Sequence, residues 1–165
     1  MKPLLSATLL CMLFPLTGCL GEIPTSNTPT KAEAALNGKP LRPGVEFTLL
    51  AADRDGRGPR INWEGESVSL QEKPLLIAAD VERVEGTLNR HGMPVLQFVV
   101  RKESRKKVED TTTAWEGQRM VLIVDGEPVA VNRLYKPITY NAEIIRIGSL
   151  EEVKALEKRI TVASP

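Results

Sequence analysis

The chain has very little of what catalytic and metal sites are usually built from. It contains one histidine and two cysteines among 165 residues, and aromatic residues make up 4% of it. His91 lies in the turn-forming run Asn89–Gly92 without an acidic or thiol neighbour, which favours a surface residue over a catalyst or a ligand. No Ser-His-Asp, Cys-His or Cys/His zinc arrangement can be assembled from this inventory. We therefore expect no enzyme, no cofactor and no metal.

An excess of charge of either sign is also missing. The chain has 22 Lys and Arg against 21 Asp and Glu, a formal net charge of +1. A balanced chain exerts no bulk electrostatic pull on nucleic acid, so we expect no nucleic-acid partner. Beyond the N-terminus, no run is long and apolar enough to cross a membrane. The length predicts one domain with a modest core.

The first 18 residues are typical of a bacterial lipoprotein signal peptide. Lys2 supplies a minimal positive region, and Leu4–Leu16 is an apolar region too short to span a bilayer. The following Leu-Thr-Gly-Cys resembles a lipobox, which implies cleavage after Gly18, a membrane anchor through lipid on Cys19, and loss of Cys11. The alternative is an ordinary signal peptide with a chance cysteine. Leu20, rather than Asp, follows Cys19, so we expect a lipid-anchored, periplasm-facing protein of the cell envelope, at the outer membrane.

Composition then divides the rest of the chain. Residues 19–42 are rich in Pro, Thr, Asn, Gly and Ala and predict a flexible tether behind the lipidated cysteine. Pro43-Gly44 marks the boundary, and residues 43–165 form the expected domain.

The second half of this domain carries the strongest structural signals. Asp125-Gly126 between the β-rich runs Met120–Val124 and Pro128–Val131 predicts a hairpin, because Gly tolerates the positive φ of a tight turn. Glu143–Ile147 predicts a further strand.

A helix is predicted directly after that strand. Ser149 is a suitable N-cap, and Glu152 completes a capping box. Three apolar side chains follow at helical spacing, whereas the charged Lys154, Glu157 and Lys158 are expected to point outward.

The first half gives weaker signals. We expect strands at Val45–Ala52 and Ile61–Val68, a hairpin over Val81–Val100, and a short or frayed helix within residues 101–118. The acidic loop from Asp53 to Pro59 superficially resembles a calcium loop, but it lacks the later ligands of an EF-hand and predicts a structural turn.

The order of these features resembles a known family. The run G-Q-R-M-V-L-I-V-D-G-E-P-V, a later Pro137-Ile138, a strand and a Ser-led helix with L-E-E-V-K-A-L are similar to the head of the first periplasmic domain of SecD, the accessory membrane subunit of the bacterial Sec translocon. The resemblance implies an α+β fold, with a small antiparallel sheet, two helices packed on one face and a ferredoxin-like layer. It also implies a protein or extended polypeptide partner, because the SecD head is thought to engage translocating chains. SecD's membrane helices and proton-relay residues have no counterpart here, which excludes energy-coupled pulling by this chain alone.

Two groups of residues are candidates for partner binding. Tyrosines are common on recognition surfaces, although a loop tyrosine can also pack back on its sheet. A basic cluster could contact anionic lipid or an acidic partner, although a solvated helix face is the simpler interpretation. The candidates are Tyr135, Tyr140, Asn141, Arg101, Lys102, Arg105, Lys106 and Lys107.

Three functions are compatible with these observations. The first is a non-enzymatic lipoprotein that binds polypeptide, accessory to protein export. The second is a structural or assembly lipoprotein that docks one fixed envelope partner, which an apolar patch without an open groove would favour. The third is a small-molecule binder or hydrolase, which a deep pocket with carboxyl groups of raised pKa would favour.

Overall fold

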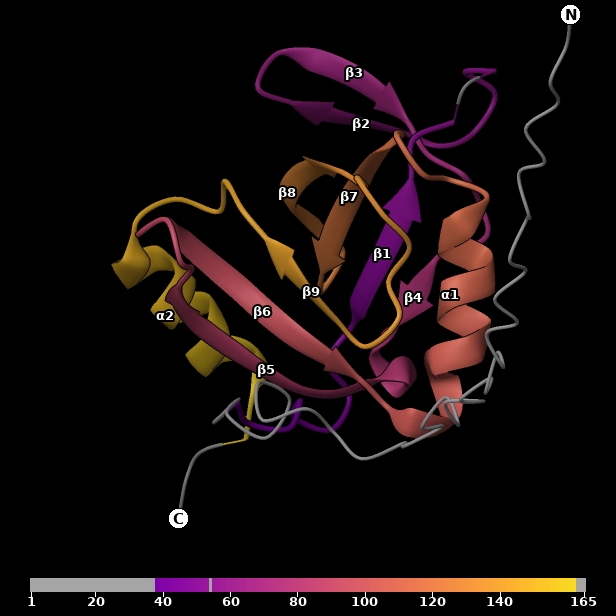
Figure 1. The fold of residues 1–165 in the computed structure, drawn as a ribbon. Helices are drawn as coiled ribbons and strands as arrows, with labels where there is room; N and C mark the ends of the chain where they lie inside the picture. Colours follow the sequence, from indigo (N-terminus) through magenta and orange to yellow (C-terminus); the bar gives the residue numbers. More distant parts are fainter. Residues whose placement is uncertain (1–37, 54, 163–165) are drawn as a thin grey trace, which may run out of the picture. The chain divides into compact units, whose positions relative to one another are not determined.

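The computed structural model describes residues 38–53 and 55–162, which contain nine strands and two α-helices (Figure 1). The predicted signal peptide 1–18, the lipidation site Cys19 and the tether before residue 38 lie outside the described residues. In the described ranges, neither helix has the length and apolar character that crossing a membrane requires.

The strands form two larger sheets and one separate hairpin, all antiparallel. The four-stranded sheet has the order β4-β1-β7-β8, the three-stranded sheet has the order β5-β6-β9, and β2 pairs with β3. The strands are β1 (Phe47–Ala51), β2 (Arg60–Trp63), β3 (Glu66–Ser69), β4 (Leu76–Ile77), β5 (Val81–Leu88), β6 (Pro94–Val100), β7 (Arg119–Val124), β8 (Glu127–Arg133) and β9 (Asn141–Ile144).

The helices are α1 (Arg105–Thr113) and α2 (Leu150–Ile160). Helix α2 packs along β5 and β6, and Figure 1 shows α1 on the other side of the view from α2. The α+β class, with antiparallel sheets and two helices, is confirmed. The strands form separate sheets rather than the one small sheet that was predicted. Each hairpin is determined by its own turn, and a turn does not specify which other strands the hairpin pairs with.

The main core fills the space between the two larger sheets and the helices. Phe47 of β1 meets Phe98 of β6 edge to face, with ring centroids 5.8 Å apart. This geometry is favoured between aromatic rings and ties the sheets together. A smaller core of Val68, Leu70, Val121 and Val131 lies under the β2–β3 hairpin. The hairpin is thereby held against the four-stranded sheet.

The β2–β3 hairpin corrects one prediction. The sequence pattern predicts a single strand over Ile61–Val68, but the chain reverses at Glu64 and Gly65, whose φ angles are 50° and 85°. Two positive φ values in a two-residue turn are characteristic of a type I′ hairpin. Glu at its first position is unusual, so the turn carries no recognisable signal. The Asp125-Gly126 turn has the same geometry, with φ angles of 50° and 80°, as predicted.

Helix α2 begins at the predicted N-cap, but one residue that was predicted to be exposed is buried. Ser149 N–H donates to Glu152 Oε2 at 2.6 Å, and Glu152 N–H donates to Ser149 Oγ at 3.2 Å, which completes the capping box. Glu157, expected to point outward, is buried. Its Oε2 accepts the N–H of Gly86 at 3.0 Å, and Lys154 Nζ lies 3.4 Å away. The carboxylate therefore satisfies a buried donor, which is why it tolerates burial.

Helix α1 is short, as expected, and it is docked by a polar residue as well as by apolar ones. Val108 is fully buried and Trp115 packs at the margin of the core, whereas Ala114 is exposed. Thr112 is buried as well. Its hydroxyl donates to the Val108 carbonyl at 2.7 Å and accepts the N–H of Ile138 at 3.0 Å, which fixes the loop after β8 to the helix.

The last residues of the segment assigned to the tether are part of the folded domain. Lys39 and Val84 exchange two backbone hydrogen bonds of 2.8 Å, and Leu41 forms an antiparallel bridge with Thr161. Arg42 pairs with Asp125 at 2.8 Å. Residues 38–42 thus extend the fold ahead of the predicted boundary at residue 43. The sequence gives no sign of this, because the backbones of Lys39 and Arg42 pair with residues far along the chain.

Candidate functional site

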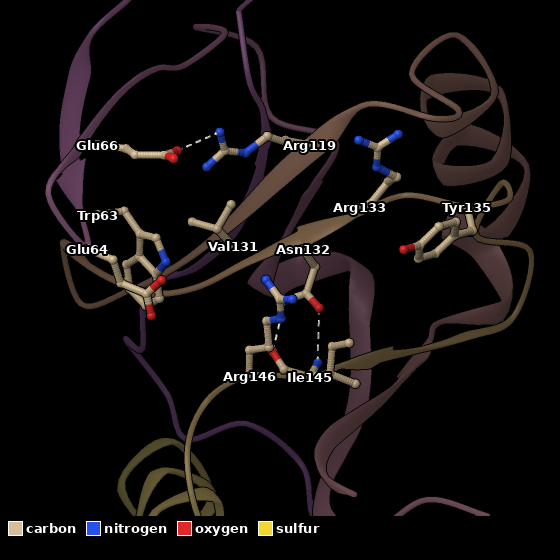
Figure 2. A pocket seen from close by; sticks show the side chains of 10 residues that line it. All are labelled: Trp63, Glu64, Glu66, Arg119, Val131, Asn132, Arg133, Tyr135, Ile145 and Arg146. Atoms are coloured by element: carbon tan, nitrogen blue, oxygen red, sulfur yellow. Dashed lines mark hydrogen bonds and ion pairs between the residues drawn. The ribbon is translucent and has the colours of Figure 1, made fainter. Parts of the chain in front are cut away.

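A pocket lies between the β2–β3 hairpin, strand β8 and the turn after β9 (Figure 2). Its volume is about 450 Å³, within the usual range for ligand sites. It is lined by Trp63, Glu64, Glu66, Arg119, Val131, Asn132, Arg133, Tyr135, Ile145 and Arg146.

The pocket runs along the outer edge of β8. Three successive residues, Val131, Asn132 and Arg133, line it. Because side chains of a strand alternate between its two faces, a cavity that touches three residues in a row fits a position at the strand's edge. In the described part of the chain, β8 ends the four-stranded sheet and has no strand on its far side.

The neighbouring residue Leu134 shows which backbone groups face this edge. Leu134 donates to the Gln118 carbonyl at 2.8 Å and accepts the Gly117 N–H at 2.6 Å, so its backbone faces the β7 side. Backbone direction alternates along a strand, which turns the N–H and C=O groups of Val131 and Arg133 toward the pocket.

Asn132 sets one wall of the pocket by joining the two sheets. Its Nδ2 donates to the Ile145 carbonyl at 3.0 Å, and its Oδ1 accepts the Ile145 N–H at 3.2 Å. The amide therefore pairs with a peptide group as a neighbouring strand would. Figure 2 shows this pair beneath β8, with Arg146 beside it.

The opposite wall is formed by the β2–β3 hairpin. Trp63 is half-buried and packs on the small core of Val68 and Val131. The hairpin is further tied to β7 by the ion pair between Glu66 and Arg119, 2.9 Å long. Packing thus holds the indole at the pocket, and the ion pair holds the hairpin that carries it.

The structure places the predicted tyrosines at two separate sites. Tyr135 lines the pocket and is 75% exposed, so the alternative that it packs back on the sheet is wrong. Tyr140 lies under the guanidinium of Arg105, 4.4 Å from ring centroid to Cζ, and Asn141 follows it as the first residue of β9. Neither Tyr140 nor Asn141 lines the pocket.

The basic cluster is largely engaged within the domain. Lys107 pairs with the buried Asp80 at 2.9 Å, Lys106 pairs with Asp110, and Arg105 covers Tyr140. Arg101 and Lys102 precede α1, outside the pocket. Three of the five cations thus have structural roles, which favours the interpretation of a solvated helix face. Their role in binding a partner stays a prediction.

None of the pocket's charged residues was among the binding residues predicted from the sequence. Arg119, Arg133 and Arg146 lie in three separate segments, and only the folded strands bring them together. One signal was available. Counting outward from the Asp125-Gly126 turn places Arg119 nearly opposite Arg133, and the observed register pairs the two directly.

The carboxyl groups with shifted pKa values do not line this pocket. Backbone N–H groups of Gly58 and Asp55 hold the pKa of Asp53 below its usual value, and Arg57 N–H donates to the same carboxylate at 2.7 Å. This network closes the loop that superficially resembles a calcium site. The backbone and side chain of Ser149 similarly lower the pKa of Glu152. Shifts in this direction do not suit a general acid.

Solved structures of SecDF share this fold. One is a crystal structure of SecDF in its Super-membrane-facing form, with a TM-score of 0.52 and 20% identity over 75% of this chain and 19% of that chain. Another is SecDF, a membrane component that enhances protein export, with a TM-score of 0.53 and 20% identity over 85% of this chain and 72% of that chain. The chain spans about a fifth of the first SecDF chain.

No protein-family model and no curated protein matches the sequence. The likeness is one of fold, to a periplasmic domain of SecDF.

Proposed function

We propose that this chain is a non-enzymatic, polypeptide-binding domain that lipid on Cys19 anchors at the periplasmic side of the cell envelope, where it serves protein export. The observation that carries this proposal is the outer edge of β8, which lies open along a pocket of about 450 Å³. The fold it shares with SecDF, a component that enhances protein export, supports the same function.

The proposed mode of binding is addition of a strand. An extended guest would bond to the outward backbone groups of Val131 and Arg133, and main-chain bonds of this kind supply affinity without demanding a particular sequence. Trp63 and Tyr135 border the same edge and offer rigid aromatic surfaces for guest side chains. A site of this kind suits many unrelated chains.

Peptides with methylated backbone nitrogens test this mode directly. The probe is a fluorescent peptide of about eight residues, a common strand length, that alternates threonine and valine. One version carries N-methyl groups on odd residues and another on even residues. Because only every second N–H of an added strand faces its partner, we expect one version to lose most of its binding and the other to keep it.

The two methylated peptides control for each other, since they share composition and length. Equal loss of binding in both versions would contradict strand addition. Absence of binding by the unmodified peptide would contradict the proposed function.

Crosslinking in the intact envelope separates a polypeptide binder from a lipoprotein that docks one fixed partner. A photoreactive residue at Tyr135 should capture many different secreted chains, while the same group at Leu88, exposed on the β5–β6 hairpin, should not. A single recurring partner at Tyr135 would favour the docking function. Incorporation of labelled palmitate, and its loss in Cys19→Ser, tests the anchor.

A further inference from the structure

We propose that the pocket beside β8 selects polypeptide segments that carry carboxylates, and that Arg133 and Arg146 recognise these groups. This inference rests on the proposed function of the same pocket. It specifies the chemical class of the guest, which strand addition alone leaves open.

The ion pairs of the pocket leave two arginines for a guest. Arg119 is matched by Glu66 at 2.9 Å. Within residues 38–53 and 55–162, Arg133 and Arg146 have neither an ion pair nor a side-chain hydrogen bond, and both are exposed. A guanidinium presents a planar fork of donors that matches a carboxylate in two parallel hydrogen bonds.

Arg133 occupies an electrostatically unfavourable position on β8. It lies directly opposite Arg119 in the β7–β8 register, and like charges at such positions repel each other. The carboxylate of Glu66, on the hairpin, compensates the charge of Arg119. Among the described residues, no carboxylate compensates the charge of Arg133. A guest carboxylate beside Arg133 would compensate this charge.

Arg146 is held at the pocket by a backbone that a glycine would adopt more easily. Its φ angle is 63°, in the left-handed region. The preceding residue, Ile145, is fixed by its two hydrogen bonds with Asn132, one accepted and one donated by the Ile145 backbone. An arginine kept in a strained conformation at the rim of a pocket is typical of a functional position.

The arginines flank the edge of β8 on both sides. Figure 2 shows Arg119 and Arg133 along one side of the pocket and Arg146, next to Asn132, on the other. Alternate side chains of an added strand point to opposite faces, so guest carboxylates at neighbouring positions can reach Arg133 and Arg146 separately. Glu64 is the one lining carboxylate without an ion pair in the described ranges, and it lies beside Trp63 at the hairpin turn.

Three matched peptides test the inference. Each alternates threonine and valine, and two adjacent central positions carry glutamate, glutamine or lysine. At low ionic strength, ~0.05 M, we expect the glutamate peptide to bind about tenfold tighter than the glutamine peptide, with the difference shrinking as salt is added. The lysine peptide should bind more weakly than the glutamine peptide.

Variants of the chain assign the effect to residues. Arg133→Gln and Arg146→Gln should each reduce the preference for glutamate over glutamine by about threefold or more and leave the Kd of the glutamine peptide nearly unchanged. Arg90→Gln removes an exposed arginine on the β5–β6 hairpin, outside the pocket, and should preserve the preference. Arg146→Gly provides a second test, because relief of the positive φ should raise the melting temperature while the preference falls.

The possible outcomes distinguish failure of carboxylate selection from failure of the proposed polypeptide binding. Equal binding of the glutamate and glutamine peptides would overturn the selection of carboxylates while strand addition stands. Binding of none of the three peptides would overturn both. A glutamate preference that survives Arg133→Gln and Arg146→Gln would overturn the assignment to these residues.

Discussion

Gly86 lies where helix α2 packs closely on strand β5. A Cβ atom at this position would lie 2.9 Å from Val153 Cγ1, 3.1 Å from the Val153 carbonyl oxygen and 3.2 Å from Glu157 Oε2. The backbone N–H of the same residue satisfies the buried carboxylate of Glu157. One glycine therefore permits both the close packing of the helix and the burial of a charge.

We predict that Gly86→Ala destabilises the domain by about 1–3 kcal/mol, because the added methyl group overpacks the contact with α2. Chemical denaturation measures the change. The double variant Gly86→Ala/Val153→Ala removes one of the clashing groups, so its cost should be smaller than the sum of the two single costs. Strictly additive costs would contradict the proposed contact.

This pair of residues also shows where sequence reasoning stops at the scale of single residues. Helical spacing predicts Val153, Leu156 and Ile160 on the buried face, and all three are buried. The same spacing predicts that Glu157 is exposed, but its side chain is buried. Its partner, Gly86, is 71 residues away, and helical periodicity within α2 carries no information about a donor on another element.

At the scale of elements, helix α1 is attached through a charge at its first turn. Lys107 Nζ lies 2.9 Å from both carboxylate oxygens of Asp80, whose side chain is 5% exposed. Burial alone would raise the pKa of Asp80, but hydrogen bonds from Lys107, the Ile77 backbone and Ser104 outweigh it and hold the pKa below its usual value. The ion pair thus joins α1 to the 3₁₀ turn Ala78–Asp80 before β5.

We predict that Lys107→Met destabilises the domain by about 1–3 kcal/mol, because it leaves a buried carboxylate without its cation. Lys106→Met is the matched control on the same helix turn. Its partner, Asp110, is exposed, so little change is expected. Equal effects of the two variants in thermal denaturation would contradict this account.

The same carboxylate predicts how stability depends on pH. The pKa of Asp80 is lower in the folded chain than its ordinary value of 3.8. Its contribution is therefore fully present above about pH 4 and is lost as the pH falls through the folded value. The difference in unfolding free energy between wild type and Asp80→Asn should be largest near neutral pH and shrink in acid. A difference that stays constant down to pH ~2 would exclude this linkage.

Elements with a local signal could be predicted, and elements without one could not. The Asp125-Gly126 hairpin and the Ser149 cap are determined by residues within four positions of each other, and both form as expected. The turn at Glu64 lacks such a signal and was missed. The pocket depends on segments from Trp63 to Arg146, so its existence follows only from how the strands assemble.

At the scale of the whole molecule, a single side chain links the two larger sheets at the pocket. Asn132 belongs to β8, and the Ile145 backbone to which it bonds directly follows β9. Because Asn132 is buried, both bonds are shielded from water, and loss of the amide would leave the Ile145 peptide group unsatisfied.

We predict that Asn132→Leu destabilises the domain by about 1–3 kcal/mol and speeds amide exchange in β9 more than in the β1–β7 pair. It should also weaken binding of the glutamate peptide, because Arg146 loses the support of Ile145. Asn141→Leu, at an exposed position on β9, is the control and should leave exchange and binding nearly unchanged. Uniform exchange changes across both sheets would contradict a local joint.

The position of residues 38–42 has a mechanical consequence. A pull on the chain from before Gly38 is borne first by the paired backbones of Lys39 and Val84 and by Arg42 on Asp125 and the end of α2. None of these residues lines the pocket, and Figure 1 shows the β2–β3 hairpin at the other end of the sheets. Tension from the N-terminal side would therefore separate Lys39 from Val84 before it distorted the edge of β8, so the pocket would keep its shape under load.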